Sequence, residues 1–117
     1  MSVFVSHVRR VREKRRATDP AFSVRKLAAR VDIQPSYLSK IERGQQPPPS
    51  EQTIAALARE LDEDPDVLLA LAGKVSAELQ AIIRHRPKLF AELIRQLKDM
   101  PEHAVLRIVR EVRDGKW

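Results

Sequence analysis

The sequence contains no cysteine and few aromatic residues, and these shortages exclude several classes of protein. Without cysteine there is neither a disulfide framework nor a thiolate metal site. Only three histidines are present, and they lie far apart in the sequence, so we expect surface residues rather than metal ligands: His7, His85 and His103. We therefore expect no metal and no cofactor.

Long apolar runs and catalytic motifs are also missing. No run approaches the roughly 18 apolar residues that a membrane span requires, so we expect no membrane association. The opening residues MSVFVSHVRR lack the apolar stretch of a secretory signal, which predicts the cytoplasm. The sequence has no Gly-rich phosphate loop and no plausible Ser-His-Asp spacing. The acidic run at 62–64 is typical of a helix end followed by a capped helix start. With no catalytic motif in the sequence, we expect no enzyme.

What the sequence does contain is positive charge with an uneven distribution. The net charge is +6 over 117 residues. Residues 1–49 hold 11 Lys or Arg against 4 Asp or Glu, residues 50–73 hold 1 against 6, and residues 74–117 hold 10 against 6. A basic first half favours phosphate neutralisation, although a merely solvated basic face is the commoner explanation when charge stands alone.

Apolar residues repeat at helical spacing along the whole chain, and no strand-like alternation interrupts them. The pattern predicts an all-α protein. Pro20, Pro35, Pro65 and Pro87 mark breaks or helix starts, while Ser23, Ser50 and Asp64 are expected N-caps. Asp99 is expected to open the last helix in a capping-box-like start. The first helix is expected from Val3 to about Arg16, the third from Pro35 to Arg43, and the fifth from Asp64 to Gly73. The sixth is expected to be capped by Ser76 or its neighbours and to break at 86–87, before a seventh helix.

The segment 24–43, VRKLAARVDIQPSYLSKIER, carries the clearest functional signal. Its first half places an apolar face on one short helix, and Asp32 interrupts that helix. Its second half buries Leu38 and Ile41 while leaving a polar and basic outer face. Two short helices joined by a turn of three to four residues form a helix-turn-helix, whose second helix fits the major groove of DNA.

These residues, with the string PSYLSKIERG at 35–44 and the prolines that follow, resemble the Cro/repressor (XRE-type) helix-turn-helix family. The resemblance covers roughly residues 4–72. It implies a five-helix repressor-like DNA-binding bundle at 1–73, followed by a helical extension of about three helices at 74–117. The expected partner is double-stranded DNA.

The resemblance also implies roles for individual residues. Ser36 and Lys40 match positions that reach base edges, and Pro35 offers an apolar contact. Tyr37 either touches DNA or packs its ring across the helix surface, and the two readings are equally favoured. The positions expected to contact the DNA backbone are Arg25, Gln34, Arg43, Gln45 and Gln46.

Glu42 requires a different role, because phosphate repels a carboxylate. In the family this position pairs with an arginine of the first helix, which Arg12 matches, so we expect a bidentate Arg12–Glu42 ion pair. The alternative is a solvent-exposed Glu42. The sequence departs from the family in two places: about five extra residues lie between Arg16 and Ser23, and Asp32 stands where the turn favours glycine.

The last 44 residues present two apolar stripes, and a segment this short has few ways to bury them alone. We therefore expect a homodimer interface. Its expected residues are Phe90, Leu93, Ile94, Leu97, Val105, Ile108, Val109, Val112 and Trp117. Packing of these helices within one subunit is the alternative.

The features together predict a sequence-specific transcriptional regulator, a repressor that binds a palindromic operator as a homodimer. Two alternatives give the tail a different role. One is the antitoxin of a toxin–antitoxin pair, whose tail binds the partner protein while the helix-turn-helix autoregulates. The other is a DNA-binding adaptor whose tail recruits other regulators.

Overall fold

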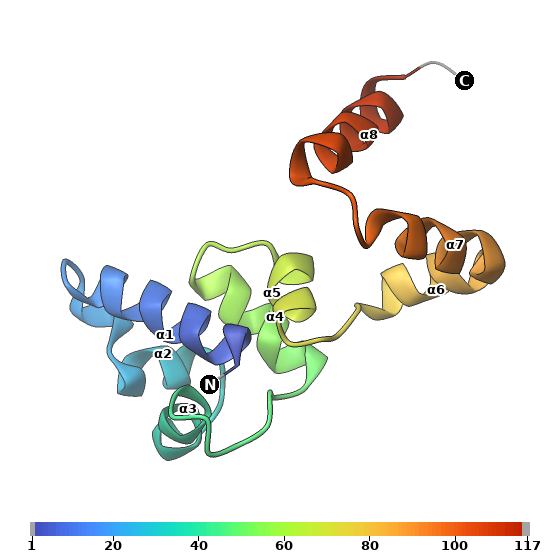
Figure 1. The fold of residues 1–117 in the computed structure, drawn as a ribbon. Helices are drawn as coiled ribbons and strands as arrows, with labels where there is room; N and C mark the ends of the chain where they lie inside the picture. The colour runs from blue at the N-terminus through green and yellow to red at the C-terminus, as the bar shows by residue number, and fades with distance from the viewer. Residues whose placement is uncertain (1, 116–117) are drawn as a thin grey trace. The chain divides into compact units, whose positions relative to one another are not determined.

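The computed structural model describes residues 2–115, and over that range it contains only helices and connecting turns (Figure 1). The all-α class predicted from the sequence is confirmed. None of these helices is both long and apolar enough to cross a membrane. In chain order the elements are α1 (Val3–Arg16), the 3₁₀ helix η1 (Pro20–Phe22), α2 (Val24–Arg30), α3 (Pro35–Glu42), α4 (Glu51–Glu60), α5 (Pro65–Leu71), α6 (Ala77–His85), α7 (Pro87–Leu97) and α8 (Glu102–Asp114).

The chain divides into two compact units, residues 1–76 and residues 77–117. The first unit contains α1 to α5 and the second contains α6 to α8. The five short helices of the first unit share one core. Helices of 7 to 14 residues are marginal when isolated, so this shared core is what stabilises them.

The core of the first unit draws apolar side chains from each of its five α-helices. Two charged residues, Arg12 and Glu42, are buried with them. The buried apolar residues are Phe4, Val5, Val8, Leu27, Ala28, Val31, Leu38, Ile41, Ile54, Leu57, Ala58, Leu61, Leu68 and Leu69.

Side-chain caps fix the starts of α2, α4 and α5 in the first unit. The Ser23 hydroxyl accepts the Lys26 N–H at 3.2 Å, Ser50 accepts the Thr53 N–H at 3.3 Å, and Asp64 accepts the Asp66 N–H at 2.8 Å. Each bond satisfies a backbone donor that the helix itself leaves open. All three caps agree with the sequence-based prediction.

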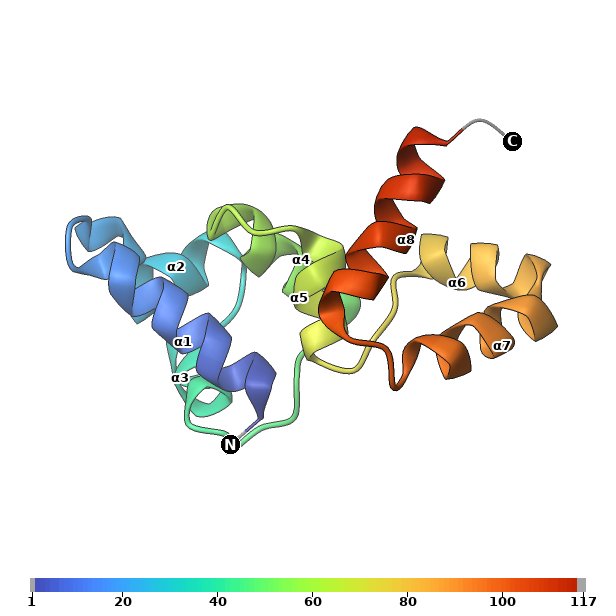
Figure 2. The same cartoon turned by 45° about the horizontal axis from the view of Figure 1, so that its top comes forward.

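The second unit has a different character. In it α6 packs against α7, and α8 follows after the turn at 98–101 (Figure 2). No residue of α6, α7 or α8 is buried. Several large apolar side chains are instead exposed, with Leu89 66% exposed and Val112 58% exposed. These helices therefore lack the enclosed core that the first unit has.

Two boundaries differ from the sequence-based prediction. Asp99 does not cap α8: the N-cap is Pro101, without a side-chain bond. The reason is Pro101 itself, because a proline disfavours helical dihedrals at the preceding residue, so Met100 cannot begin the helix. The second difference is at α3, which ends at Glu42, with Arg43 as its C-cap. The start of α6 at Ala77 agrees with the cap expected at Ser76 or its neighbours.

Candidate nucleic-acid interface

The turn between α2 and α3 has the geometry that a helix-turn-helix requires. Asp32 adopts a left-handed conformation with φ of 59°, which lets the chain reverse directly after α2. The Ile33 N–H then donates to the Ala28 carbonyl at 3.0 Å. Aspartate tolerates this conformation better than most residues, so it replaces the glycine that the family favours.

The two faces of α3 differ sharply in burial. Leu38 and Ile41 are fully buried and anchor the helix to the core. On the other side Ser36 and Lys40 are exposed, as expected for residues that reach base edges. Pro35 is half-buried at the first helical position, and Gln34 is the exposed N-cap without a side-chain cap bond. The helix therefore presents a short polar surface with a single lysine.

Tyr37 is half-buried, and its side chain packs against the core. Packing of the ring was one of the two alternatives predicted for Tyr37. A contact from Tyr37 to DNA stays a prediction.

The C-terminal end of α3 is closed by backbone bonds and an arginine. Gly44 has φ of 72°, and the Gln45 N–H donates to the Lys40 carbonyl at 2.9 Å, which terminates the helix. The exposed Arg43 donates from Nε to the Ser39 carbonyl at 3.3 Å. Gln45 and Gln46 follow and are also exposed. Three donors predicted to contact phosphate therefore lie next to one another in the chain, directly after α3.

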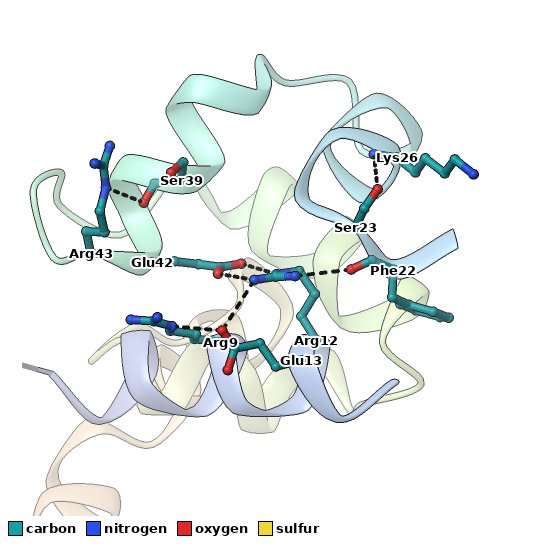
Figure 3. A network of polar contacts seen from close by, with 9 residues as sticks. All are labelled: Arg9, Arg12, Glu13, Phe22, Ser23, Lys26, Ser39, Glu42 and Arg43. Carbon is teal, nitrogen blue, oxygen red and sulfur yellow. Dashed lines mark hydrogen bonds and ion pairs between the residues drawn. The ribbon is translucent and has the colours of Figure 1, made fainter. Parts of the chain in front are cut away.

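The first turn of α2 adds two cations. Arg25 and Lys26 are both exposed, and Figure 3 shows the Lys26 side chain extending away from the helix beside the capping Ser23. Sequence reasoning singled out Arg25 and missed Lys26. Lys26 could have been identified from its position in the first turn of α2, next to Arg25 and off the apolar face of the helix.

Arg12 and Glu42 form a buried bidentate pair between α1 and α3 (Figure 3). Arg12 Nε donates to Glu42 Oε2 at 2.6 Å and Nη2 donates to Oε1 at 2.7 Å. The residues are 7% and 4% exposed. The hydrogen bond to Glu42 raises the pKa of Arg12, against the lowering effect of burial. The guanidinium therefore stays charged while it holds the Glu42 carboxylate.

The third nitrogen of the Arg12 guanidinium bonds the loop between Arg16 and Ser23, which contains the extra residues relative to the family. Arg12 Nη1 donates to the Phe22 carbonyl at 3.2 Å. Glu13 lies 3.9 Å from the same guanidinium and also accepts from Arg9 Nε at 3.1 Å. Among the described residues, no buried side-chain nitrogen or oxygen lacks a partner. The extra residues therefore complete the Arg12 site rather than displace it.

That loop is itself held in place by cations. Residues 20–22 form η1, and the Phe22 ring lies 5.4 Å from the Arg15 guanidinium and 5.2 Å from that of Arg30. Arg30 also donates to the Ala21 carbonyl at 2.6 Å and to Glu60 at 2.9 Å. The loop is thus tied to α1 and α2, and Arg30 also connects α2 to α4. Sequence reasoning predicted a break here and missed Phe22.

The residues predicted for dimerisation lie in the second unit. Six of them line one apolar groove between α7 and α8, of about 460 Å³. Phe90 lines a separate hollow of about 260 Å³ with Ile82 and Leu89, and Ile94 is half exposed at 49%. Trp117 lies outside the described residues. The six groove residues are Leu93, Leu97, Val105, Ile108, Val109 and Val112.

Comparison with known families agrees with this geometry. A family model described as "Helix-turn-helix domain" matches residues 4–71, which is more than half of the chain and spans α1 to α5. No curated protein and no solved structure gives a significant match. The chain therefore belongs to the helix-turn-helix domain family, and its first unit is the domain of a DNA-binding regulator.

Proposed function

We propose that this protein is a sequence-specific transcriptional repressor that binds a palindromic operator as a homodimer, without enzymatic activity, in the cytoplasm. The observation that carries the proposal is the exposed face of α3. Lys40 and Ser36 project from a helix whose opposite face is fixed by Leu38, Ile41 and the Arg12–Glu42 pair. A rigid helix with short polar groups outside is suited to reading base edges.

The charges around α3 support the same role. Arg25 and Lys26 are exposed at the start of α2, and Arg43 is exposed at the end of α3. Cations on either side of a reading helix fix its register on the phosphate backbone, while the helix itself supplies sequence preference. Glu42 does not oppose this, because its charge is neutralised by Arg12.

We infer palindromic binding from the small number of base pairs that one helix-turn-helix domain contacts. A single helix-turn-helix covers only a few base pairs, so tight and specific binding requires two half-sites. A homodimer provides two readers related by a two-fold axis. The exposed apolar surface of α7 and α8 is suited to joining the copies. Repression then requires only that the dimer occupy DNA and exclude competing proteins.

Selection of bound sites from a pool of random duplex DNA tests the proposal. We expect the intact protein to enrich an inverted repeat whose half-sites lie about 10 base pairs apart, centre to centre. A matched selection with Lys40→Ala should lose preference at one position in each half-site. Recovery of unenriched DNA would contradict sequence-specific binding, and recovery of single, unrepeated sites would contradict the palindromic operator.

A further inference from the structure

The apolar groove of the second unit, called here the tail groove, lies between α7 and α8 and is lined by the six residues named above. Its volume is about 460 Å³. Val109 and Val112 on its α8 wall are 51% and 58% exposed, and Leu93 on its α7 wall is 47% exposed. Arg113 lies at its rim. An amphipathic helix matches a surface with two apolar walls and a charged rim.

The size of the second unit indicates that the tail groove is covered. Segments of about 40 residues seldom enclose a sufficient core, and those that are stable usually rely on disulfides, metals or oligomerisation. The chain has no cysteine, and α6 to α8 contain no buried residue. A covering helix would provide the burial that these helices lack.

The spacing of the apolar stripe on α8 is compatible with packing against a second copy of α8 about a two-fold axis. Its members Val105, Ile108, Val109 and Val112 have the same spacing when read from either end, with the centre between Ile108 and Val109. If two α8 helices run antiparallel about a two-fold axis at that centre, Val105 lies opposite Val112 of the second copy. Ile108 likewise lies opposite Val109. A two-fold interface requires such self-complementarity.

The charges beside the stripe fit the same arrangement. Glu102 and Arg113 are eleven residues apart, about three helical turns, so they lie along the same edge of α8. An antiparallel two-fold pair brings that edge against itself, which sets Glu102 of each copy beside Arg113 of the other. Arg113 now donates to Asp114 at 2.9 and 3.2 Å, and both side chains are largely exposed. Its five N–H donors can serve both carboxylates.

We infer that two copies of this chain pair through antiparallel α8 helices, with the second copy's α8 seated in the tail groove and two intermolecular Glu102–Arg113 pairs at its rim. The inference rests on the proposed homodimer and adds its orientation and register. A parallel two-fold pairing would place the Glu102 edges of the two copies on opposite sides of the interface, where Glu102 of one copy does not reach Arg113 of the other. The two Glu102–Arg113 pairs are therefore specific to the antiparallel form.

Charge reversal in the intact chain tests this pairing directly. In a homodimer of Glu102→Arg, each edge would carry only arginines, and in a homodimer of Arg113→Glu only glutamates. Sedimentation over a concentration series should show that each variant alone has a dimer dissociation constant raised about tenfold, because two attractive pairs become repulsive. An equimolar mixture restores opposite charges at both positions. It should form heterodimers with a dissociation constant within about threefold of the unmodified protein.

The mixture also controls for folding, because each chain keeps its own substitution and only its partner changes. Arg107→Glu, a reversal on the outer face of α8, should leave dimerisation unchanged. Heterodimers no tighter than the two homodimers would overturn the pairing. An intact protein that stays monomeric at micromolar concentration would also overturn it. Affinity for a duplex carrying one half-site, measured on the same samples, reports separately on the proposed DNA binding.

Discussion

Arg12 of α1 and Glu42 of α3, thirty residues apart in the sequence, meet in a buried pair with bonds of 2.6 and 2.7 Å. The pair joins the first helix to the helix that we propose reads DNA. It also removes a negative charge from the end of that helix. Since Arg12 additionally bonds the Phe22 carbonyl, one guanidinium connects three elements of the first unit.

Replacing Arg12 should therefore destabilise the fold as well as weaken DNA binding. Arg12→Ala leaves the Glu42 carboxylate buried without its partner, and breaking such a pair costs about 3–5 kcal/mol. Urea denaturation of Arg12→Ala, Glu42→Gln and the double variant measures the coupling. Arg9→Ala, which removes an exposed pair with Glu13, is the control and should cost about 0.5 kcal/mol or less. Additive losses in the double variant would argue against the pair.

The Phe22 ring should contribute through its two arginines. Phe22→Leu keeps an apolar side chain but removes the contacts to Arg15 and Arg30, so we expect a loss of about 1–2 kcal/mol in unfolding free energy. A double-mutant cycle with Arg15→Gln isolates one of the two contacts. If the two changes prove independent, Arg15 makes no cation–π contribution to the ring.

Lys40→Ala tests base reading. Loss of one base contact should weaken binding to the selected operator by about 1–3 kcal/mol and relax preference at one base pair in each half-site. Lys88→Ala, an exposed lysine of α7, is the matched control and should leave binding to a half-site duplex unchanged. Equal losses on operator and random DNA would reassign Lys40 to a phosphate contact.

Truncation after Ser76 tests whether the first unit binds DNA by itself and the second unit forms the dimer. This boundary keeps Lys74, whose ammonium donates to the Pro49 carbonyl at 2.9 Å. The first unit retains its whole core, so we expect a folded monomer that binds a half-site weakly and no longer prefers the full palindrome. Circular dichroism and sedimentation provide the measurements. A truncated protein that still dimerises would place the interface in the first unit.

Local sequence signals predicted most of the first unit. The caps at Ser23, Ser50 and Asp64 depend on a few neighbouring residues, and so does the turn at Asp32. The Arg12–Glu42 pair spans thirty residues, yet the family resemblance supplied it, and the structure contains it.

What the sequence could not predict depends on contacts formed only in three dimensions. Phe22 follows a turn that was read as a simple break, and its partners Arg15 and Arg30 come together only when α1 and α2 pack. At α8 the error was local. The acid at 102 suggested a cap at Asp99, but the constraint that Pro101 places on Met100 moves the helix start to Glu102.

The most direct test of the account is the ratio of two affinities, measured for the intact protein at one salt concentration. One duplex carries the selected inverted repeat, and the other has the same composition in scrambled order. Specific regulators bind their sites about 10³-fold or more tightly than other DNA, and we predict a ratio in that range. A ratio near one, with both affinities falling equally as salt rises, would show only phosphate binding and would contradict sequence-specific regulation.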